Sequence, residues 1–265
     1  MATVRAIPES MDAATVAAID RRLDGIEASE GVTILWGIES GSRAWGFPSP
    51  DSDYDCRFLY MRGLGDYLSP WPPRDVIETP LDKVFDVNGW DLAKALRLFV
   101  KGNGTLTEWL RSPIVYCGDP VFRDQFLALA ERVTDRAMLG RHYRHVGLHQ
   151  LAGERPSLKR FLYALRPAAV LHWLDTHPDR AVPPMELMTA LEDGDAPRQV
   201  RIAAADLVAL KAATHEFGHG EVPDVLARFV DTQLTRAERF ESAVRPDPAE
   251  AQKLCEAFFE RVVAR

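Results

Sequence analysis

The segment Gly41–Asp55, with the sequence GSRAWGFPSPDSDYD, lies between two apolar segments that predict β-strands. The first apolar segment covers residues 32–36, and the second follows a loop rich in Pro and Ser and covers about residues 54–61. Alternate side chains of a strand point to the same face, so Asp53 and Asp55 should lie side by side. Neighbouring carboxylates repel each other unless a cation or a proton lies between them. This segment therefore predicts a cation site at the start of the second strand.

The chemistry of the segment suits Mg²⁺ together with a phosphate. Mg²⁺ prefers hard oxygen ligands, uses few carboxylates, and completes its octahedron with water and substrate phosphates. The turn at Gly41 and Ser42 precedes a short helical segment, and it offers backbone N–H groups and a hydroxyl to a phosphate. Asp51 begins the acidic run in the turn after Pro50, where turn geometry alone explains an aspartate. We favour that interpretation for Asp51.

The spacing of these residues resembles a known superfamily. Gly-Ser followed by Asp-x-Asp, with ten residues between Ser42 and Asp53, resembles the DNA polymerase beta-like nucleotidyltransferases. The longer string GSRAWGFPSPDSDYDCRF resembles more narrowly a family of predicted nucleotidyltransferases associated with RNA repair, called RlaP-like. Three later segments also resemble that family, namely DVNGWDLAKALRLFVKGN, LTEWLRSPIVY and LKRFLYALRPAAVLHWL. The resemblance covers roughly residues 30–180.

The resemblance implies an enzyme that transfers the nucleotidyl group of a nucleoside triphosphate to a hydroxyl and releases pyrophosphate. It also implies two Mg²⁺ ions, or Mn²⁺ in their place, which activate the attacking hydroxyl and neutralise the leaving pyrophosphate. Asp53 and Asp55 match the family's metal ligands, and the third carboxylate of the family comes from a neighbouring strand. Our candidate for it is Asp86, in a third predicted strand at residues 83–87. Asp91 is the alternative, although it precedes a helix and is also explained as a helix cap.

Residues around these carboxylates are candidates for contacts with the nucleotide. By the family pattern, Gly41 and Ser42 would hold the terminal phosphates. Arg43 and Arg57 either bind phosphate or balance the acidic residues, and both interpretations stay open.

A second group of nucleotide-binding candidates lies in the later part of the chain. Lys159, Tyr163 and Arg166 recur at positions i, i+4 and i+7 of a predicted helix and so share one face. This face could clamp the triphosphate from the far side of a cleft, since arginine offers paired N–H donors to phosphate oxygens. A solvated face of ion pairs is the alternative interpretation. Lys94 and Asn103 are further candidates on the substrate side.

The pattern of apolar residues indicates an α+β fold class. It predicts helices at residues 10–29 and 90–100, with Gly89 ending the third strand. After residue 106 nearly the whole pattern is helical, and Gly and Pro stand where helices end. We expect a small mixed-sheet domain that resembles the polymerase beta palm, residues 1–118, followed by an all-helical domain, residues 119–265. The later helices are expected at 105–111, 119–133, 136–151, 157–177, 184–191, 198–217, 223–243 and 247–264.

The composition is that of an ordinary globular protein, with 265 residues of which 46% are hydrophobic and 27% charged. No apolar run approaches the roughly 20 residues of a membrane-spanning helix, and the N-terminus lacks the pattern of a signal peptide. The three cysteines are far apart and odd in number, which suits reduced thiols. We therefore expect a cytoplasmic protein without a membrane partner.

The charge distribution bears on the acceptor. A net charge of −7 argues against a protein that coats nucleic acid non-specifically. Residues 132–166 nevertheless contain eight Lys and Arg and only two Asp and Glu. With the resemblance to an RNA-repair family, this basic segment favours RNA or tRNA as the acceptor, because such contacts to phosphate give affinity for any sequence. A protein side chain and a small hydroxylated metabolite are the alternatives.

Two other functions compete with this interpretation. Residues 215–219 read HEFGH and match the H-E-x-x-H string of zinc proteases, but Gly218, Gly220 and Pro223 argue against the continuous helix which that site needs. A nucleotide-binding sensor or an antitoxin-like partner with the same fold is the more serious rival. Loss of a metal ligand would favour the sensor, whereas all three predicted carboxylates are present, so we favour catalysis.

Overall fold

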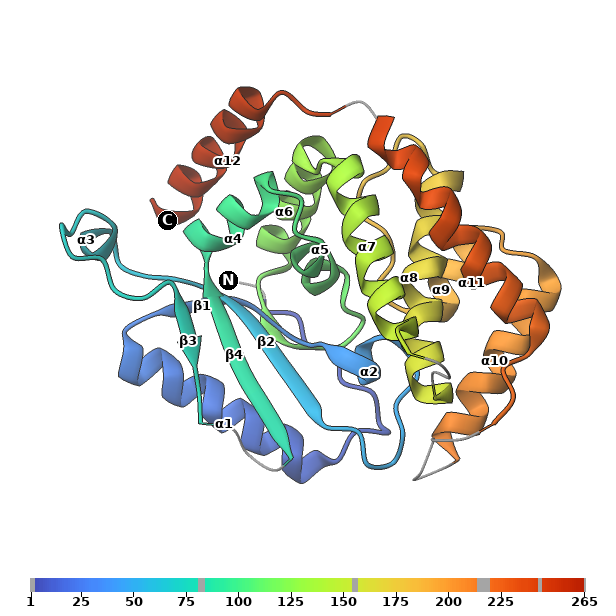
Figure 1. The fold of residues 1–265 in the computed structure, drawn as a ribbon. Coiled ribbons are helices and arrows are strands. Elements are labelled where there is room, and N and C mark those ends of the chain that lie inside the picture. The colour runs from blue at the N-terminus through green and yellow to red at the C-terminus, as the bar shows by residue number, and fades with distance from the viewer. Residues whose placement is uncertain (1–2, 81–83, 154–156, 214–219, 243–244, 265) are drawn as a thin grey trace.

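The computed structural model describes residues 3–80, 84–153, 157–213, 220–242 and 245–264. The strands are β1 (Thr33–Glu39), β2 (Tyr54–Met61), β3 (Val76–Glu78), β4 (Phe85–Asp91) and β5 (Val115–Gly118). They form one sheet with the order β3-β4-β2-β1-β5. β2 and β4 are parallel, and the other neighbouring pairs are antiparallel. This mixed sheet with its many helices confirms the predicted α+β class (Figure 1).

Most predicted helices are present within a few residues of their expected bounds. The first, α1 (Ala13–Glu30), starts at Asp12, whose carboxylate accepts from the N–H of Thr15, and ends at Gly31 in the left-handed conformation. The remaining helices are α2 (Gly41–Ala44), α3 (Leu64–Tyr67), α4 (Leu92–Val100), α5 (Gly104–Arg111), α6 (Pro120–Val133), α7 (Arg136–Leu151), α8 (Leu158–Thr176), α9 (Leu187–Asp193), α10 (Arg198–Ala212), α11 (Asp224–Arg236), the 3₁₀-helix η1 (Ala237–Ser242) and α12 (Pro248–Val263). The pattern of caps and apolar spacing therefore predicts most of these helices, but it predicted neither α3 nor the short strand β3.

The two faces of the sheet bury different helices. Even-numbered residues 54–60 of β2 pack with the apolar side of α1. Leu59, on the opposite face, packs with residues of α4, α5, α6 and α12. Because side chains alternate along a strand, Asp55 and Arg57 also lie on the face opposite α1. The face of the sheet that carries Asp55 and Arg57 is thus the one turned toward the later helices.

A third core lies among helices α7 to α11 and η1, beside the sheet in Figure 1. The central helix of this bundle is α8, most of whose residues are buried. Phe47 comes from the loop after α2, yet it is fully buried within the core of the bundle. The segment that joins β1 to β2 therefore also attaches the sheet to the bundle.

The expectation that Gly89 ends a strand is wrong, as is the expectation that a helix starts at Trp90. β4 continues through Gly89 to Asp91, and α4 begins at Leu92. Gly89 is paired with Phe58 of β2, and the buried Phe58 ring occupies the space that a Cβ on Gly89 would need. The glycine is therefore explained by close packing inside the sheet and not by chain termination.

The nearly all-helical pattern expected after residue 106 is interrupted by one strand that was not predicted. Residues 115–118 form β5, which pairs antiparallel with β1 at one edge of the sheet. An isolated bridge between Ala6 and Val115 extends this edge. A short apolar run cannot be assigned to a strand or a helix by its periodicity, and pairing with β1 decides it here.

Among the described residues, no helix combines the length and the apolarity needed to cross a bilayer.

Candidate functional site

The turn between β1 and α2 is shaped by a carboxylate. Gly41 adopts a φ of 62°, and a Cβ at this position would collide with the Asp55 carboxylate. The backbone N–H of Ser40 donates to the carbonyl of Asp55 at 2.8 Å. Only glycine combines this conformation with so close an approach. The turn at Gly41 and Ser42 and the carboxylate of Asp55 therefore lie together, and this group is here called the Gly-Ser corner.

Two of the predicted carboxylates meet on neighbouring strands. Asp55 of β2 and Asp86 of β4 are register partners in the parallel pair. Between them lies the guanidinium of Arg57, with Nη2 3.2 Å from Oδ1 of Asp55 and 2.9 Å from Oδ2 of Asp86. The amide of Asn88 donates to both carboxylate oxygens of Asp86, at 2.8 and 3.0 Å. Arg57 thus balances the acidic residues, which is one of the two roles expected for it.

The electrostatics of Asp55 show that acidic groups crowd this corner. Burial raises the pKa of the Asp55 carboxyl, and the charges of Asp86 and Asp53 raise it further, while Arg57 and Arg43 lower it. A cation near Asp55 would relieve both the desolvation and the repulsion. The donor set is thus chemically suited to a hard divalent ion.

Asp53 is less closely engaged than the other two carboxylates. It is exposed and directly precedes β2. In the part of the chain that the structure describes, no three His, Cys, Asp or Glu side chains are grouped closely enough to hold a metal. The structure therefore brings Asp55 and Asp86 together through Arg57, with Asp53 near enough to affect Asp55. A shared metal site for all three remains a prediction.

Arg43 contacts the loop before β2. Its Nη2 donates to the carbonyl of Ser52 at 2.6 Å, and its Nε donates to the carbonyl of Asp53 at 3.2 Å. The guanidinium also lies 3.9 Å from the centre of the Tyr54 ring. These contacts hold the loop in place, and a contact with nucleotide remains a prediction.

The Ser42 hydroxyl joins the corner to the helical bundle. It donates to the hydroxyl of Ser52 at 3.0 Å. Burial raises the pKa of Tyr163 on α8, and a hydrogen bond with Ser42 partly offsets that effect. The Tyr163 ring packs edge-on against Trp45 and Phe47, with centroids 5.4 and 5.7 Å apart. Tyr163 is thus placed near Ser42, and its contact with nucleotide remains a prediction.

The other two residues of the predicted α8 face have different surroundings. Lys159 is exposed one turn before Tyr163. Arg166 is only 5% exposed, its Nη2 lies 2.8 Å from Oε1 of Glu108, and its Nε donates to the carbonyl of Met185. Its observed partners therefore belong to the protein interior, and a role as phosphate ligand remains a prediction.

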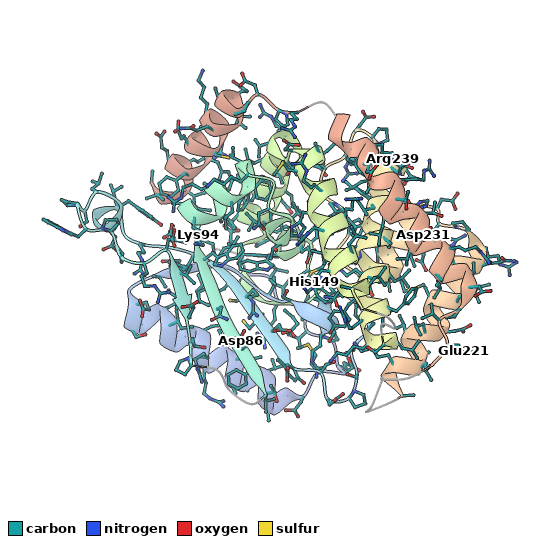
Figure 2. All side chains as sticks on the ribbon, viewed as in Figure 1. Asp86, Lys94, His149, Glu221, Asp231 and Arg239 are labelled. Atoms are coloured by element: carbon teal, nitrogen blue, oxygen red, sulfur yellow. The ribbon has the colours of Figure 1, made fainter. Side chains whose placement is uncertain are left out.

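The alternative carboxylate, Asp91, caps a helix. It accepts from the N–H of Ala93 at 2.8 Å and from the hydroxyl of Tyr67 at 3.0 Å. Its partner in β2 is Tyr60, so Asp91 lies at the other end of β4 from Asp86. Figure 2 shows Asp86 on β4, apart from Lys94 of α4. The hydrogen bond from the N–H of Ala93 confirms the cap interpretation of Asp91.

The two further substrate-side candidates, Lys94 and Asn103, contact other residues of the protein. Lys94 lies 3.2 Å from Oδ1 of Asp75. The side chain of Asn103 caps α5 by accepting from the N–H of Thr105 at 3.0 Å. Among the described residues, the polar contacts of Lys94 and Asn103 are with Asp75 and Thr105 and not with the Gly-Ser corner. The H-E-x-x-H string, at 215–219, lies outside the described residues.

Sequence patterns missed a buried carboxylate behind the corner. Glu39 is the last residue of β1 and is fully buried. It accepts from the backbone N–H of Asp55 at 2.8 Å and from the hydroxyl of Tyr116 at 2.6 Å. Burial raises the pKa of Glu39 to about 7, although these two hydrogen bonds lower it. An acidic residue at the end of an apolar strand is the signal that could have identified it.

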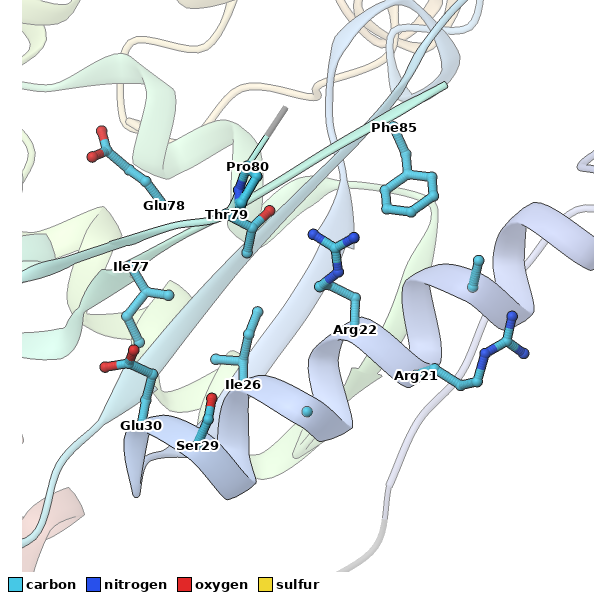
Figure 3. A pocket seen from close by; sticks show the side chains of 12 residues that line it. Arg21, Arg22, Ile26, Ser29, Glu30, Ile77, Glu78, Thr79, Pro80 and Phe85 are labelled. Atoms are coloured by element: carbon cyan, nitrogen blue, oxygen red, sulfur yellow. The ribbon is translucent and has the colours of Figure 1, made fainter. Parts of the chain in front are cut away.

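A cleft of about 610 Å³ lies away from this corner, between α1 and the β3–β4 region. Arg22, Ile26, Ile77 and Phe85 are among the residues that line it (Figure 3). The Arg22 guanidinium lies 5.4 Å from the centre of the Phe85 ring. None of the predicted site residues lines this cleft, so the cleft gives no support to a nucleotide site at the Gly-Ser corner.

Comparison with known proteins gives three findings. The model of the RlaP family, described as the RNA repair pathway DNA polymerase beta family, matches residues 16–260. An uncharacterised protein of Bacillus subtilis (strain 168), YcgL, is 36% identical over 218 residues, covering 81% of this chain and 83% of that one. The crystal structure of a nucleotidyltransferase-like protein from Exiguobacterium sibiricum 255-15 aligns with 92% of this chain and 79% of that chain, at 11% identity and a TM-score of 0.30. That structural likeness is too low to support an inference.

Proposed function

Since this chain belongs to the RNA repair pathway DNA polymerase beta family, we propose that it is a nucleotidyltransferase that transfers a nucleoside monophosphate from a triphosphate to a hydroxyl. One observation carries the proposal. Asp55 and Asp86 lie on adjacent parallel strands, and the Gly41 turn packs directly against Asp55. This arrangement places acidic groups beside a turn suited to phosphate, as phosphoryl transfer requires.

The carboxylates Asp53, Asp55 and Asp86 are the residues that would hold Mg²⁺ or Mn²⁺. Their oxygens are the ligands these ions prefer, and the raised pKa of Asp55 reflects a site that favours added positive charge. When bound, the metal ions would activate the hydroxyl and neutralise the leaving pyrophosphate. Arg57 bridges Asp55 and Asp86 at present, so its guanidinium would have to yield part of this contact.

The protein itself would bind and orient the triphosphate. Ser42 and Tyr163 present hydroxyl groups at the corner, and Arg43 holds the loop that leads into β2. Lys159 is exposed on the same helix as Tyr163, and in this proposal its ammonium group contacts the phosphates of the nucleotide. In this proposal Arg166 supports α8 from within, through Glu108.

RNA or tRNA is the acceptor that we propose. The family description names an RNA repair pathway, and the segment 132–166 is basic. Part of that charge is already used within the protein, since Arg144 pairs with Glu238 at 3.0 Å. Arg141 is exposed and available to a phosphate backbone. Transfer to RNA should therefore weaken with rising salt, because each phosphate contact releases counterions.

The function is tested by incubating the protein with each of the four α-labelled nucleoside triphosphates, Mg²⁺ and bulk RNA. We expect pyrophosphate release and labelled RNA from the wild type. Asp55→Asn should lower the rate by ~100-fold or more, as loss of one preorganised charge-stabilising group does in other enzymes. Its fold should be retained, because asparagine removes a crowded charge without changing the size of the side chain.

Asp24→Asn is the matched control, since Asp24 is exposed on α1, on the other face of the sheet. It should react at the wild-type rate. Full activity of Asp55→Asn would refute the site. Tight binding of triphosphate without turnover by the wild type would instead support the nucleotide sensor. The ion pairs of Arg57 with both Asp55 and Asp86 favour this rival, because they occupy the carboxylates that would bind metal.

A further inference from the structure

Lys211 is a buried lysine that the sequence pattern did not single out. It lies in the last turn of α10, and the residue is only 1% exposed. Its ammonium lies over two aromatic rings, 4.8 Å from the centre of the Phe47 ring and 5.2 Å from that of Tyr163. Both rings belong to the wall between the Gly-Ser corner and the helical bundle.

Among the described residues, the ammonium of Lys211 has two aromatic rings as its close contacts and no anionic one. Among the described residues, no carboxylate lies within ion-pair distance of Nζ, and no acceptor forms a hydrogen bond with it. Burial and the nearby charge of Lys159 lower the pKa of Lys211 to about 8, while Asp51 opposes this. Ring faces compensate a desolvated cation only in part. With respect to the described residues, an anion beside Lys211 would therefore be stabilised.

The surroundings of Lys211 indicate which anion fits. The centre of the Tyr163 ring lies 5.2 Å from the Lys211 ammonium, and the Ser42 hydroxyl is near enough to lower the pKa of Tyr163. The charges of Asp55 and Asp53 reach the same tyrosine. Tyr163 is thus a neighbour of Lys211 and is also influenced by the charges of Asp55 and Asp53. If the triphosphate of a nucleotide extended from the Gly-Ser corner past Tyr163, its terminal phosphate would lie beside Lys211 and Lys159.

We propose that Lys211 binds phosphate in the nucleotide site. Through this contact the site would bind nucleoside triphosphates more tightly than monophosphates. The proposal rests on the proposed function. The flexible four-carbon stem lets the ammonium leave the ring faces and donate to the terminal phosphate. A purely structural lysine at this helix end would only complement the helix dipole and the rings.

Binding measured by calorimetry tests the assignment, with inorganic tripolyphosphate, a non-hydrolysable ATP analogue and AMP as probes in the presence of Mg²⁺. Lys211→Met keeps the apolar stem and removes the charge. We expect it to weaken binding of both triphosphate probes by ~10-fold or more, which corresponds to one charged hydrogen bond. Binding of AMP should be unchanged, and Lys211→Arg should restore most of the triphosphate affinity.

Lys253→Met is the matched control, because Lys253 is exposed on α12. It should bind all probes like the wild type. If the wild type binds the triphosphates and Lys211→Met binds them equally well, the assignment is refuted while the nucleotidyltransferase proposal stands. If the wild type binds neither triphosphate probe, both proposals fail.

Discussion

Asp55 is the residue through which most contacts of the candidate site pass. Its carboxylate lies against Gly41 and pairs with Arg57, and its backbone is held by Glu39 and Ser40. A side chain that must bind metal or reactant needs such fixed neighbours, because small displacements cost much of the rate. The buried Glu39 is therefore a structural support for the position of Asp55.

The pKa of Glu39 predicts a pH dependence of stability. Folding raises this pKa from 4.5 to about 7, so the folded state favours the protonated form. The resulting stabilisation is complete below pH 4.5 and is lost as pH rises through 7. Glu39→Gln cannot ionise, so its stability relative to wild type should rise by on the order of 1–3 kcal/mol over that range. Urea unfolding at several pH values measures this.

Glu260→Gln, at an exposed position of α12, is the control and should follow the wild-type curve. Parallel pH curves for Glu39→Gln and the wild type would show that Glu39 does not titrate in this range.

At the scale of elements, α8 serves two neighbours at once. Lys159 and Arg166 share a face by helical spacing, but seven residues correspond to about 10 Å along the axis. The middle residue, Tyr163, therefore reaches the Gly-Ser corner, while Arg166 reaches Glu108 of α5. A common face on a helix thus predicts a common direction, but it does not predict a common partner.

The pairing of β2 with β4 depends on Gly89. Its Cα faces the buried ring of Phe58, so Gly89→Ala forces the ring or the strand to move. We expect a loss of about 1–3 kcal/mol in the free energy of unfolding, as for other overpacked cores. Chemical denaturation of purified protein is the measurement.

Gly25→Ala is the contrasting control within α1. A Cβ at Gly25 would meet no atom within 4 Å. Alanine there should stabilise the helix by up to about 1 kcal/mol. If both variants shift stability in the same direction, the packing explanation for Gly89 is wrong.

At the scale of the whole molecule, the C-terminal helix returns to the sheet. Figure 1 shows α12 beside α4 and α6, far from the bundle that precedes it in the chain. Phe258 of α12 is buried, with its ring 5.0 Å from that of Phe126 and 5.9 Å from that of Phe122. The C-terminal helix therefore shares one core with α4, α6 and one face of the sheet.

Phe258→Ala tests how much this contact stabilises the protein. Loss of a buried phenylalanine should lower the free energy of unfolding by about 3–5 kcal/mol. We expect α12 to become sensitive to protease before the rest of the chain does, which mass spectrometry of the fragments would show. Ile202→Ala, at a position that is 51% exposed, should change stability by less than about 0.5 kcal/mol. Similar effects of the two variants would contradict a shared core.

The sequence alone determined the helices, the strand that carries Asp55, the Gly-Ser turn and the family. Each of these depends on spacing within a short segment, and local periodicity and turn chemistry encode such spacing directly. It also placed Asp86 ahead of Asp91, because a cap signal is local as well.

Only the tertiary structure decided the strand order, the role of Gly89, the assignment of β5, and the contacts of Arg57, Glu39 and Lys211. All of these depend on residues that are distant in sequence and meet only in the folded chain. The sequence does not distinguish a glycine that ends a strand from one, such as Gly89, that leaves room for an aromatic ring. Nor does it show that Lys211 is buried, because the rings of Phe47 and Tyr163 that lie near it come from distant segments. Packing therefore supplied what periodicity could not.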